Sequence, residues 1–348
     1  MTSKPHSLHN DIECGVRGGK LDARRVFKIE PPALIFVMAD IHFPFHDPQA
    51  LRLALECFSQ VVRSIPEDRR LYVALLGDIV DFHGISRFPK PPHRSSGFVS
   101  ELYADRFLVQ LLIEQLKSRS EGKARIIWAL GNHEERLEYY LMGKAKELYD
   151  LDVLRVDQLL RVGSDVTVLR SSLLPGSRED RVQAEIDVCG RLILTHGHQF
   201  RNVNSSSAQV SPARLLYQRT GAQMIIGHLH RNDAYIFTDY RGKPHGFWVV
   251  GCLCLPRPNW DASRIWSQGI AIVDVWKSTH GETRFSVVHV PFIPDGENLE
   301  ASFWGHTISV GPSRPPYELE RLWKMNPDEV TVPPGLWVDP IQKKGRRK

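Results

Sequence analysis

The sequence predicts an α/β fold with mixed sheets, and three observations support this. Apolar runs typical of buried strands alternate with helical patterns through the first half of the chain. In the second half the apolar runs become shorter and more frequent, as in a meander of strands. Polar side chains that can bind metals or carry charge directly follow five of the apolar runs. The 348 residues are enough for one large domain or two ordinary ones.

The first half predicts three strands, each followed by a helix. The continuous apolar runs 33–40, 71–76 and 124–130 are typical of buried strands. Asp47 and Pro48 form an N-cap and a first-turn proline, so a helix is expected from there through about residue 62. Further helices are expected at about 99–118 and 134–149, and a loop rich in proline, serine and basic residues spans 83–97.

The second half predicts shorter elements. Strands are expected at 166–169, 181–188, 191–195, 247–251, 269–276 and 284–292, with a helix near 211–220. We expect an N-terminal arm over 1–30, a main domain over 31–295 and a proline-rich extension over 296–348. The extension is expected to wrap the surface and to end in the basic run 343–348.

Composition narrows the class of protein. The chain is 42% hydrophobic and 24% charged, as in soluble globular proteins. No apolar run approaches the roughly 20 residues of a membrane span, and the first residues are too polar for a signal peptide. The five cysteines lack framework spacing, so we expect a reducing, cytoplasmic compartment and no membrane partner. A net charge of +5 permits a nucleic-acid partner without requiring one.

Five motifs carry the functional signal. They are Asp-x-His at 40–42, Gly-Asp-x-x-Asp at 77–81, Gly-Asn-His at 131–133, His-Gly-His at 196–198 and Gly-His-x-His at 227–230. Each motif alone is weak, because Gly-Asp is a common turn and a lone Asp-x-His is more often a cap or a core histidine. Sites in open α/β sheets form outside the carboxyl ends of strands, so the five motifs can meet in one crevice.

The residue types indicate two metal ions. Asp, Asn and His offer oxygen and nitrogen ligands without a thiolate, which favours manganese, iron, zinc or a similar ion. The side chains are too many for one tetrahedral ion and suit two ions about 3.5–4 Å apart that share a carboxylate. A zinc-protease helix is excluded, because Leu137 stands where His-Glu-x-x-His requires its second histidine.

In this order and spacing, the motifs resemble those of the calcineurin-like metallophosphoesterases over residues 34 to about 275. The stretches ADIHFPFHD and LGDIVDFHGISRF are similar to phosphoesterases of phages and bacteria. The resemblance implies a four-layer αββα sandwich with mixed sheets. It implies that the protein acts in the cytoplasm of a bacterium or of a phage-infected host cell. It also implies the ligands: Asp40, His42 and His230 for one ion, Asn132, His196 and His228 for the other, and Asp78 for both.

The resemblance further implies the catalytic roles. His133 would donate a proton or a hydrogen bond to the leaving oxygen, and Asp81 would orient His133. A hydroxide between the two ions would attack phosphorus in line. Glu134 is expected only to be an acidic residue favoured at a helix N-terminus. His198 either supports the ligands or simply follows the turn.

The chain departs from the protein-phosphatase branch of the family at two positions. That branch has Arg-Gly after its Gly-Asp-x-Val-Asp motif, where this chain has Phe82-His83, and an arginine where this chain has Leu130. Such arginines grip a phosphate monoester, and a diester has one fewer ionised oxygen. We therefore expect a phosphodiesterase, with nuclease activity included, that acts on nucleic acid or nucleotides.

Several alternatives stay open. A phosphomonoesterase could use other arginines, and Arg87, Arg94 and Arg201 are either phosphate contacts or ordinary surface residues. A non-catalytic scaffold of the same fold could bind nucleic acid, with aromatic side chains stacked on bases. Trp248, Trp260 and Trp266 are expected to pack instead. Among the metals manganese is expected first, with iron, zinc, nickel, cobalt and magnesium as alternatives.

Overall fold

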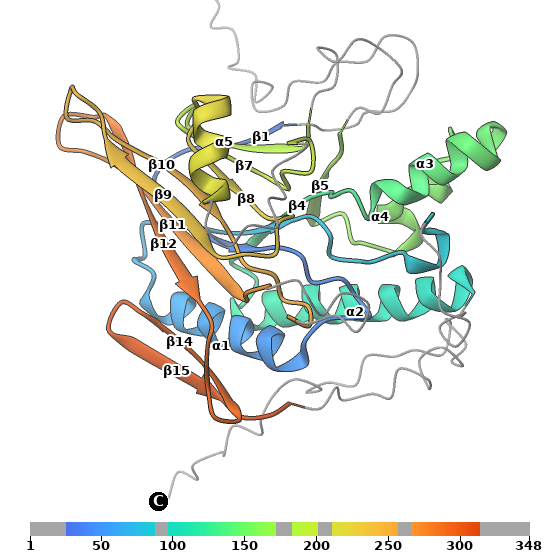
Figure 1. Ribbon diagram of the computed structural model, residues 1–348. Helices are drawn as coiled ribbons and strands as arrows, with labels where there is room; N and C mark the ends of the chain where they lie inside the picture. The colour runs from blue at the N-terminus through green and yellow to red at the C-terminus, as the bar shows by residue number, and fades with distance from the viewer. Residues whose placement is uncertain (1–25, 88–96, 172–182, 201–210, 257–265, 314–348) are drawn as a thin grey trace, which may run out of the picture.

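Two six-stranded sheets, stacked face to face, form the centre of the fold in the computed structural model (Figure 1). The structure describes residues 26–87, 97–171, 183–200, 211–256 and 266–313. In strand order, one sheet consists of β12 (Thr283–Pro291), β11 (Gly269–Lys277), β2 (Ala33–Met38), β3 (Arg70–Leu76), β4 (Arg125–Ala129) and β5 (Val166–Leu169). The other consists of β1 (Val26–Ile29), β6 (Glu185–Val188), β7 (Leu192–Thr195), β8 (Met224–Ile226), β10 (Pro244–Val249) and β9 (Asp233–Thr238).

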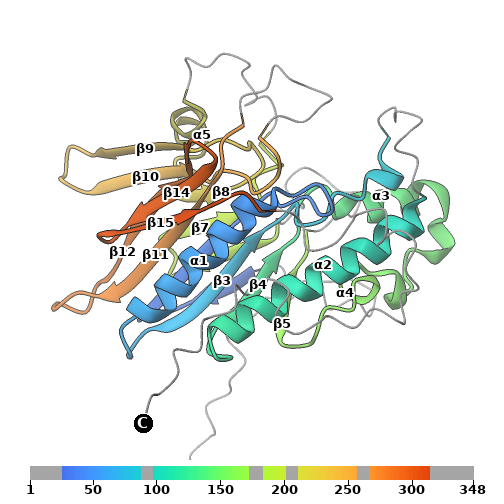
Figure 2. The same ribbon diagram turned by 90° about the horizontal axis from the view of Figure 1, so that it is seen from below.

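Helices cover the outer faces of both sheets. Helices α1 (Pro48–Ser64) and α2 (Phe98–Arg119) lie side by side on the sheet that contains β2, and α5 (Pro212–Thr220) lies on the other sheet (Figures 1 and 2). Shorter elements follow β3, β4 and α3: η1 (His83–Ile85), α3 (Glu135–Lys144), η3 (Lys146–Leu148), η4 (Asp152–Leu154) and α4 (Val156–Leu159). The resulting layers confirm the predicted αββα sandwich with mixed sheets.

The sequence of β2 shows why the fold has these layers. Successive side chains of a strand point to opposite faces, so a continuous apolar run fills two cores at once. Phe36 belongs to the core under α1 and α2, where its ring lies 5.2 Å from that of Phe58. Ile35 and Val37 belong to the core between the sheets. A third, smaller core lies under α5 and contains Leu216 and Phe247.

The predicted helix starts and strands agree well with the structure, with some differences in length. The carboxylate of Asp47 caps α1 by accepting hydrogen bonds from the N–H groups of Gln49 and Ala50, at 2.9 and 3.3 Å. Helix α3 ends at Lys144, earlier than the expected residue 149, and Ala145 leaves the helical conformation with φ −153° and ψ 54°. Trp248 is buried between the sheets, as expected, whereas Trp260 lies outside the described residues.

The expected surface-wrapping segment after residue 295 instead begins with a regular hairpin. Strands β13 (Ile293–Asp295), β14 (Asn298–Phe303) and β15 (His306–Val310) form a small antiparallel sheet. The hairpin lies against α1 (Figure 2), and Leu299, Ala301, Phe303 and Val310 join the core under that helix. The alternation of buried and exposed residues in β14 explains the hairpin, and the prolines further along the chain obscured this short pattern.

The structure tests the expectation that no segment crosses a membrane only for its helices. Within the described ranges, no helix is both long and apolar enough to span a bilayer.

Candidate metal centre

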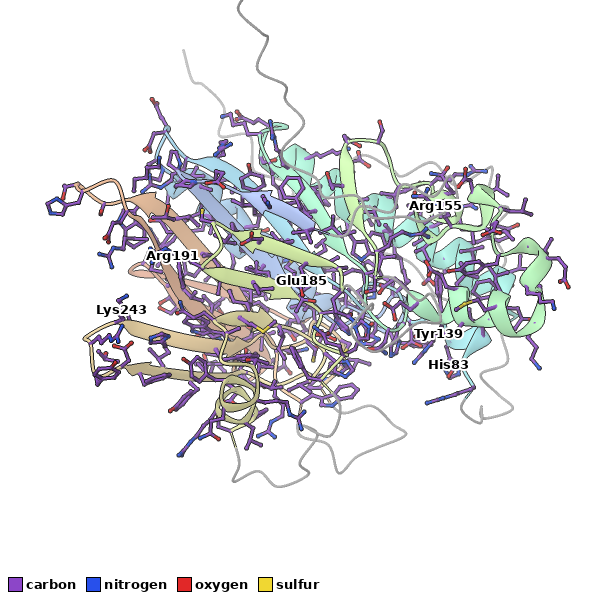
Figure 3. The ribbon with its side chains drawn as sticks, turned by 90° about the horizontal axis from the view of Figure 1, so that it is seen from above. His83, Tyr139, Arg155, Glu185, Arg191 and Lys243 are labelled. Carbon is purple, nitrogen blue, oxygen red and sulfur yellow. The ribbon has the colours of Figure 1, made fainter. Side chains whose placement is uncertain are left out.

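The candidate metal centre lies where strands of both sheets end. Its side chains come from the segments that follow β2 (40–42), β3 (78–81), β4 (132–133), β7 (196) and β8 (228–230). Strands β2, β3 and β4 are parallel, and so are β7 and β8, so their carboxyl ends can share one edge. In Figure 3, His83 and Tyr139, from the segments after β3 and β4, lie at one end of the molecule and Lys243 at the other.

One group of ligand atoms comes from Asp40, His42, Asp78 and His230, all of them buried. Nε2 of His230 lies 3.1 Å from Oδ1 of Asp40 and 3.1 Å from Nε2 of His42. Nε2 of His42 lies 3.8 Å from Oδ2 of Asp78. One ligand atom from each of the four residues lies within 4.8 Å of all the others, which is the spacing of a cation site.

A second group shares Asp78 with the first and adds His196 and His228. Nε2 of His196 lies 3.2 Å from Oδ2 of Asp78 and 3.1 Å from Oδ1 of Asn132. Nδ1 of His196 lies 2.8 Å from the carbonyl oxygen of Leu76. Because Nδ1–H donates to that carbonyl, Nε2 keeps its lone pair for a metal. The structure therefore brings all seven predicted ligands together, with Asp78 common to both groups.

The backbone of the centre is strained where the ligands are attached. Five of the predicted ligands have positive φ angles: Asp40 (53°), His42 (55°), Asp78 (49°), His228 (66°) and His230 (53°). Residues with a side chain seldom adopt this conformation, and each instance costs about 1–3 kcal/mol. The loops also approach closely, since a Cβ on Gly77 would lie 2.6 Å from Cα of Gly131. Strain and close approach of this kind cluster at functional sites.

At Asp78 and His196, burial and the neighbouring charges shift the pKa in opposite directions. Burial alone would raise the pKa of Asp78, but the neighbouring His133 and His196 hold it well below its ordinary value. Burial would lower the pKa of His196, but the Asp78 and Asp40 carboxylates and the Leu76 carbonyl together outweigh burial and raise it to about 10. Burial and the charge of His196 lower the pKa of His228 to about 3. His228 is thus neutral at physiological pH, as a metal ligand must be, and a cation would compete with the proton on His196.

Asp81 contacts two histidines rather than one. Its Oδ2 lies 3.2 Å from Nδ1 of His42 and 3.5 Å from Nδ1 of His133, and its carbonyl oxygen lies 3.1 Å from the latter nitrogen. The sequence predicted that Asp81 orients His133. The structure adds His42, whose Nδ1–H donates to Asp81 and leaves Nε2 to face Asp40 and Asp78.

Glu134 has a larger role than the helix-dipole prediction gave it. Its side chain is fully buried and accepts hydrogen bonds from four backbone N–H groups at 2.7–3.1 Å: those of Asp78, Ile79, Val80 and Gly131. The carboxylate thus joins the loop after β3 to the loop after β4. Acidic residues at helix starts are common, so nothing in the sequence distinguished this residue from an exposed one.

The other predicted site residues have different positions. Nε2 of His198 lies 3.2 Å from Oε2 of Glu135, and its ring lies 5.3 Å from that of His196, so it borders the ligands without joining either group. Arg87 is exposed on the segment after η1. Arg94 and Arg201 lie outside the described residues.

Sequence reasoning missed two neighbours of the centre, Cys254 and Arg136, and expected only packing from a third, Trp266. The thiol of Cys254 forms a further potential ligand group with His42 and His230, although the cysteines had suggested no metal role. The ring of Trp266 lies 4.1 Å from that of His230. Arg136 of α3 contacts both Asp81 and His133. None of these residues belongs to a motif, and only the fold brings them to the centre.

The residues present fit a pair of divalent cations. The Nε2 atoms of His42 and His230 face each other at 3.1 Å, so at most one of them can carry a proton toward the other. Both nitrogens also lie near buried carboxylate oxygens, and this combination of neutral nitrogen and anionic oxygen donors suits a metal. The shared carboxylate of Asp78 suits two ions rather than one.

Comparison with known proteins defines the class. The sequence profile of the calcineurin-like phosphoesterases matches residues 33–247, which include all seven predicted ligands. The chain belongs to this family, whose members are metal-dependent. No curated protein sequence matches the chain significantly.

Two solved structures are similar at low identity. Vps29 of Chaetomium thermophilum is 11% identical, and the match covers 74% of this chain and 96% of that chain with a TM-score of 0.27. A point mutant of a cold-active protein tyrosine phosphatase is 10% identical, with 81% of each chain covered and a TM-score of 0.31. Similarity this low adds nothing to the assignment of function.

Proposed function

We propose that the protein is a dinuclear metal-dependent phosphoester hydrolase that prefers phosphodiesters in nucleic acids or nucleotides. The observation that carries this proposal is the pair of buried ligand groups that share Asp78. A non-catalytic scaffold would have no use for two complete ligand groups with a histidine and a carboxylate beside them. Two bound divalent cations would supply positive charge against the phosphoryl oxygens and lower the pKa of a water molecule.

The residues of this chain would hold and orient the reacting groups. Asp81 fixes the ring of His42 through Nδ1 and leaves Nε2 for a ligand. His133 lies beside the bridging carboxylate, with Nε2 3.6 Å from Oδ2 of Asp78. From this position the ring can interact with the leaving oxygen of a phosphoester bound at the two groups.

We propose a preference for diesters because two positions that hold arginine in the protein-phosphatase branch hold other residues in this chain. Phe82 follows Asp81 and Leu130 precedes Gly131, and both side chains are buried in the core under α1 and α2. Neither position provides the guanidinium that the protein-phosphatase branch uses for a monoester. Manganese is proposed as the native metal because the carboxylate oxygens of Asp40 and Asp78 suit it, with iron, zinc, nickel, cobalt and magnesium as alternatives. We further propose a cytoplasmic location, without a membrane partner.

The test is a paired measurement on purified protein. Metals per chain are counted after loading with manganese, and hydrolysis of bis-p-nitrophenyl phosphate is compared with that of p-nitrophenyl phosphate. Two metals per chain and a preference for the diester support the proposal. A preference for the monoester would indicate a phosphatase, and metal-free, inactive protein would indicate a scaffold. Asp78→Asn is the control, because it removes the carboxylate that both groups share.

A further inference from the structure

Arg136 is a basic residue of the centre that belongs to no family motif in the sequence. Its Nη2 lies 2.8 Å from Nε2 of His133. Its Nη1 lies 2.7 Å from the carbonyl oxygen of Asp81 and 3.0 Å from Oδ1 of the same residue. One guanidinium therefore contacts both residues of the predicted catalytic pair.

The start of α3 holds this guanidinium in place. His133 and Arg136 are three residues apart, which places them on one face of a helical turn, and the N–H of Arg136 donates to the carbonyl of His133 at 3.2 Å. The buried carboxylate of Glu134 ties the same turn to the loop that carries Asp78. The side chain of Arg136 is 20% exposed. The arginine is thus fixed at both ends, and part of its side chain remains exposed.

The contacts define what each ring nitrogen of His133 does. Arginine has donors only, so one Nη2–H donates to Nε2 of neutral His133, whose Nδ1–H donates to the carbonyl oxygen of Asp81. In this arrangement the second Nη2–H is the donor for a leaving oxygen, and His133 becomes a proton donor only when the Nη2–Nε2 contact opens and Nε2 gains a proton. Nε2 of His133 also lies 3.6 Å from Oδ2 of Asp78, the carboxylate common to both ligand groups. The space bordered by Nη2 of Arg136 and Nε2 of His133 is therefore next to the metal groups.

We propose that Arg136 is a catalytic residue that binds the leaving oxygen of the phosphoester beside His133. This inference rests on the proposed function. As the bond between phosphorus and the leaving oxygen breaks, its electron pair stays on that oxygen, which accepts a hydrogen bond from Nη2–H. Water gives its oxygen to phosphorus and one proton, through the site or the solvent, to the leaving oxygen. Arginine keeps its charge throughout, so it stabilises the developing anion without giving up a proton.

The position of Arg136 also bears on the missing monoester arginines. An arginine at the position of Leu130 would come from the end of β4, whereas Arg136 comes from the first turn of α3. Its contact with His133 places it toward the leaving group instead of the terminal oxygens. Leaving groups that are poor acids, such as the sugar hydroxyls of nucleic acids, would gain most from a fixed positive charge there.

The test is a leaving-group series. Manganese-loaded wild-type protein, Arg136→Met and Arg136→Lys are assayed on phosphodiesters whose phenol leaving groups range from p-nitrophenol to weakly acidic phenols. We expect Arg136→Met to lower kcat by about 10²- to 10³-fold for the weakest acids and far less for p-nitrophenol. Arg136→Lys should be intermediate, because lysine keeps the charge but not the planar fork.

Arg69→Met is the matched control. Arg69 is similarly exposed, at 16%, and has its own ion pair with Asp274 at 2.9 Å, away from the centre. It should change no kinetic constant, and all variants should bind two metals per chain. An equal loss across the series, no loss, or a loss of metal in Arg136→Met would overturn the assignment of Arg136.

A second measurement separates this inference from the proposed function. If the wild-type protein hydrolyses no phosphoester, the proposed function fails, and orthophosphate binding to the manganese-loaded proteins is measured by calorimetry. Weaker binding in Arg136→Met than in Arg69→Met would then keep Arg136 as an anion contact. Equal binding in the two variants would overturn that contact as well.

Discussion

The carboxylate of Glu134 accepts a hydrogen bond from the backbone N–H of Asp78 at 2.9 Å. Glu134 itself lies just after Asn132 in the chain, at the end of the loop that follows β4. The same carboxylate binds the N–H groups of Gly131, Ile79 and Val80. Two loops that are more than fifty residues apart in the chain are thus held by one buried side chain. The relative position of the bridging carboxylate and the amide ligand depends on this contact.

Replacing Glu134 should therefore damage stability and metal binding together. Glu134→Ala leaves four buried N–H groups without their acceptor, and each such group costs about 1–3 kcal/mol. We expect a loss of at least about 3 kcal/mol in the free energy of unfolding, measured by urea denaturation. The control is Glu121→Ala, which removes an exposed carboxylate that pairs with Lys123 at 3.0 Å. A loss no larger than that of the control would contradict the role of Glu134.

The two ligand groups should lose metal separately. His228 belongs only to the group with His196, whereas His42 belongs to the group with Asp40. His228→Ala and His42→Ala should each reduce the content from two metals to one, and Asp78→Asn should weaken both sites. Metal content is measured by mass spectrometry after dialysis. Loss of both metals from His228→Ala would show that the two groups do not bind independently.

Metal binding should stabilise the folded protein. A ligand that binds only the native state raises stability by about 2.7 kcal/mol at a hundred times its Kd. We expect chelator treatment to lower the Tm of the wild-type protein and to have little effect on Asp78→Asn. An unchanged Tm in the wild type would argue against tight metal binding.

Asp81 should affect both metal binding and turnover, because it contacts His42 and His133. Carboxylates that orient a ligating histidine change metal affinity by about 10- to 100-fold when they are mutated. Asp81→Asn should therefore weaken one metal site and lower kcat even at saturating metal. His133→Ala should keep both metals and lower kcat by about 10²- to 10⁴-fold. Loss of metal from His133→Ala would show that His133 is a metal ligand and would contradict its catalytic role.

Stability should fall in mild acid because of His46. This side chain is 4% exposed, and burial lowers its pKa from 6.5 to about 4. As the pH falls, His46 of the unfolded chain binds a proton before His46 of the folded protein does. The contribution of neutral His46 to stability is therefore fully present above pH 6.5 and is lost progressively between pH 6.5 and about pH 4. The contribution is at most about 3 kcal/mol. His46→Gln should reduce the difference in unfolding free energy between pH 7 and pH 5. An unchanged difference would contradict the role assigned to His46.

Much of the centre could be predicted because its residues follow apolar strands directly. A strand that is buried on both faces has a continuous apolar sequence, and its end is visible as the first polar residue, such as Asp40 or Asp78. Parallel strands then bring these ends together without any information about loops. The five motifs were predicted in this way, and the resemblance to the phosphoesterase family then implied which seven of their residues are ligands.

The rest depended on contacts that the sequence does not mark. Glu134 and Arg136 are ordinary residues for the first turn of a helix, and their roles arise from loops that approach that turn from β3. Strand β9 alternates between partly buried and exposed residues at a sheet edge, and the hairpin β14–β15 is similarly half exposed. Weak alternation of this kind is hard to distinguish from a polar loop.

The left-handed backbone at five ligand positions has a consequence for laboratory evolution. Glycine adopts such φ angles without strain, so glycine at Asp40, Asp78 or His228 would relieve the backbone while removing a ligand atom. Selection of the metal-free protein for heat resistance would therefore favour substitutions at the predicted ligand positions. A screen for a more robust form of this protein should retain metal binding as a second criterion, since otherwise it would enrich stable variants without a centre.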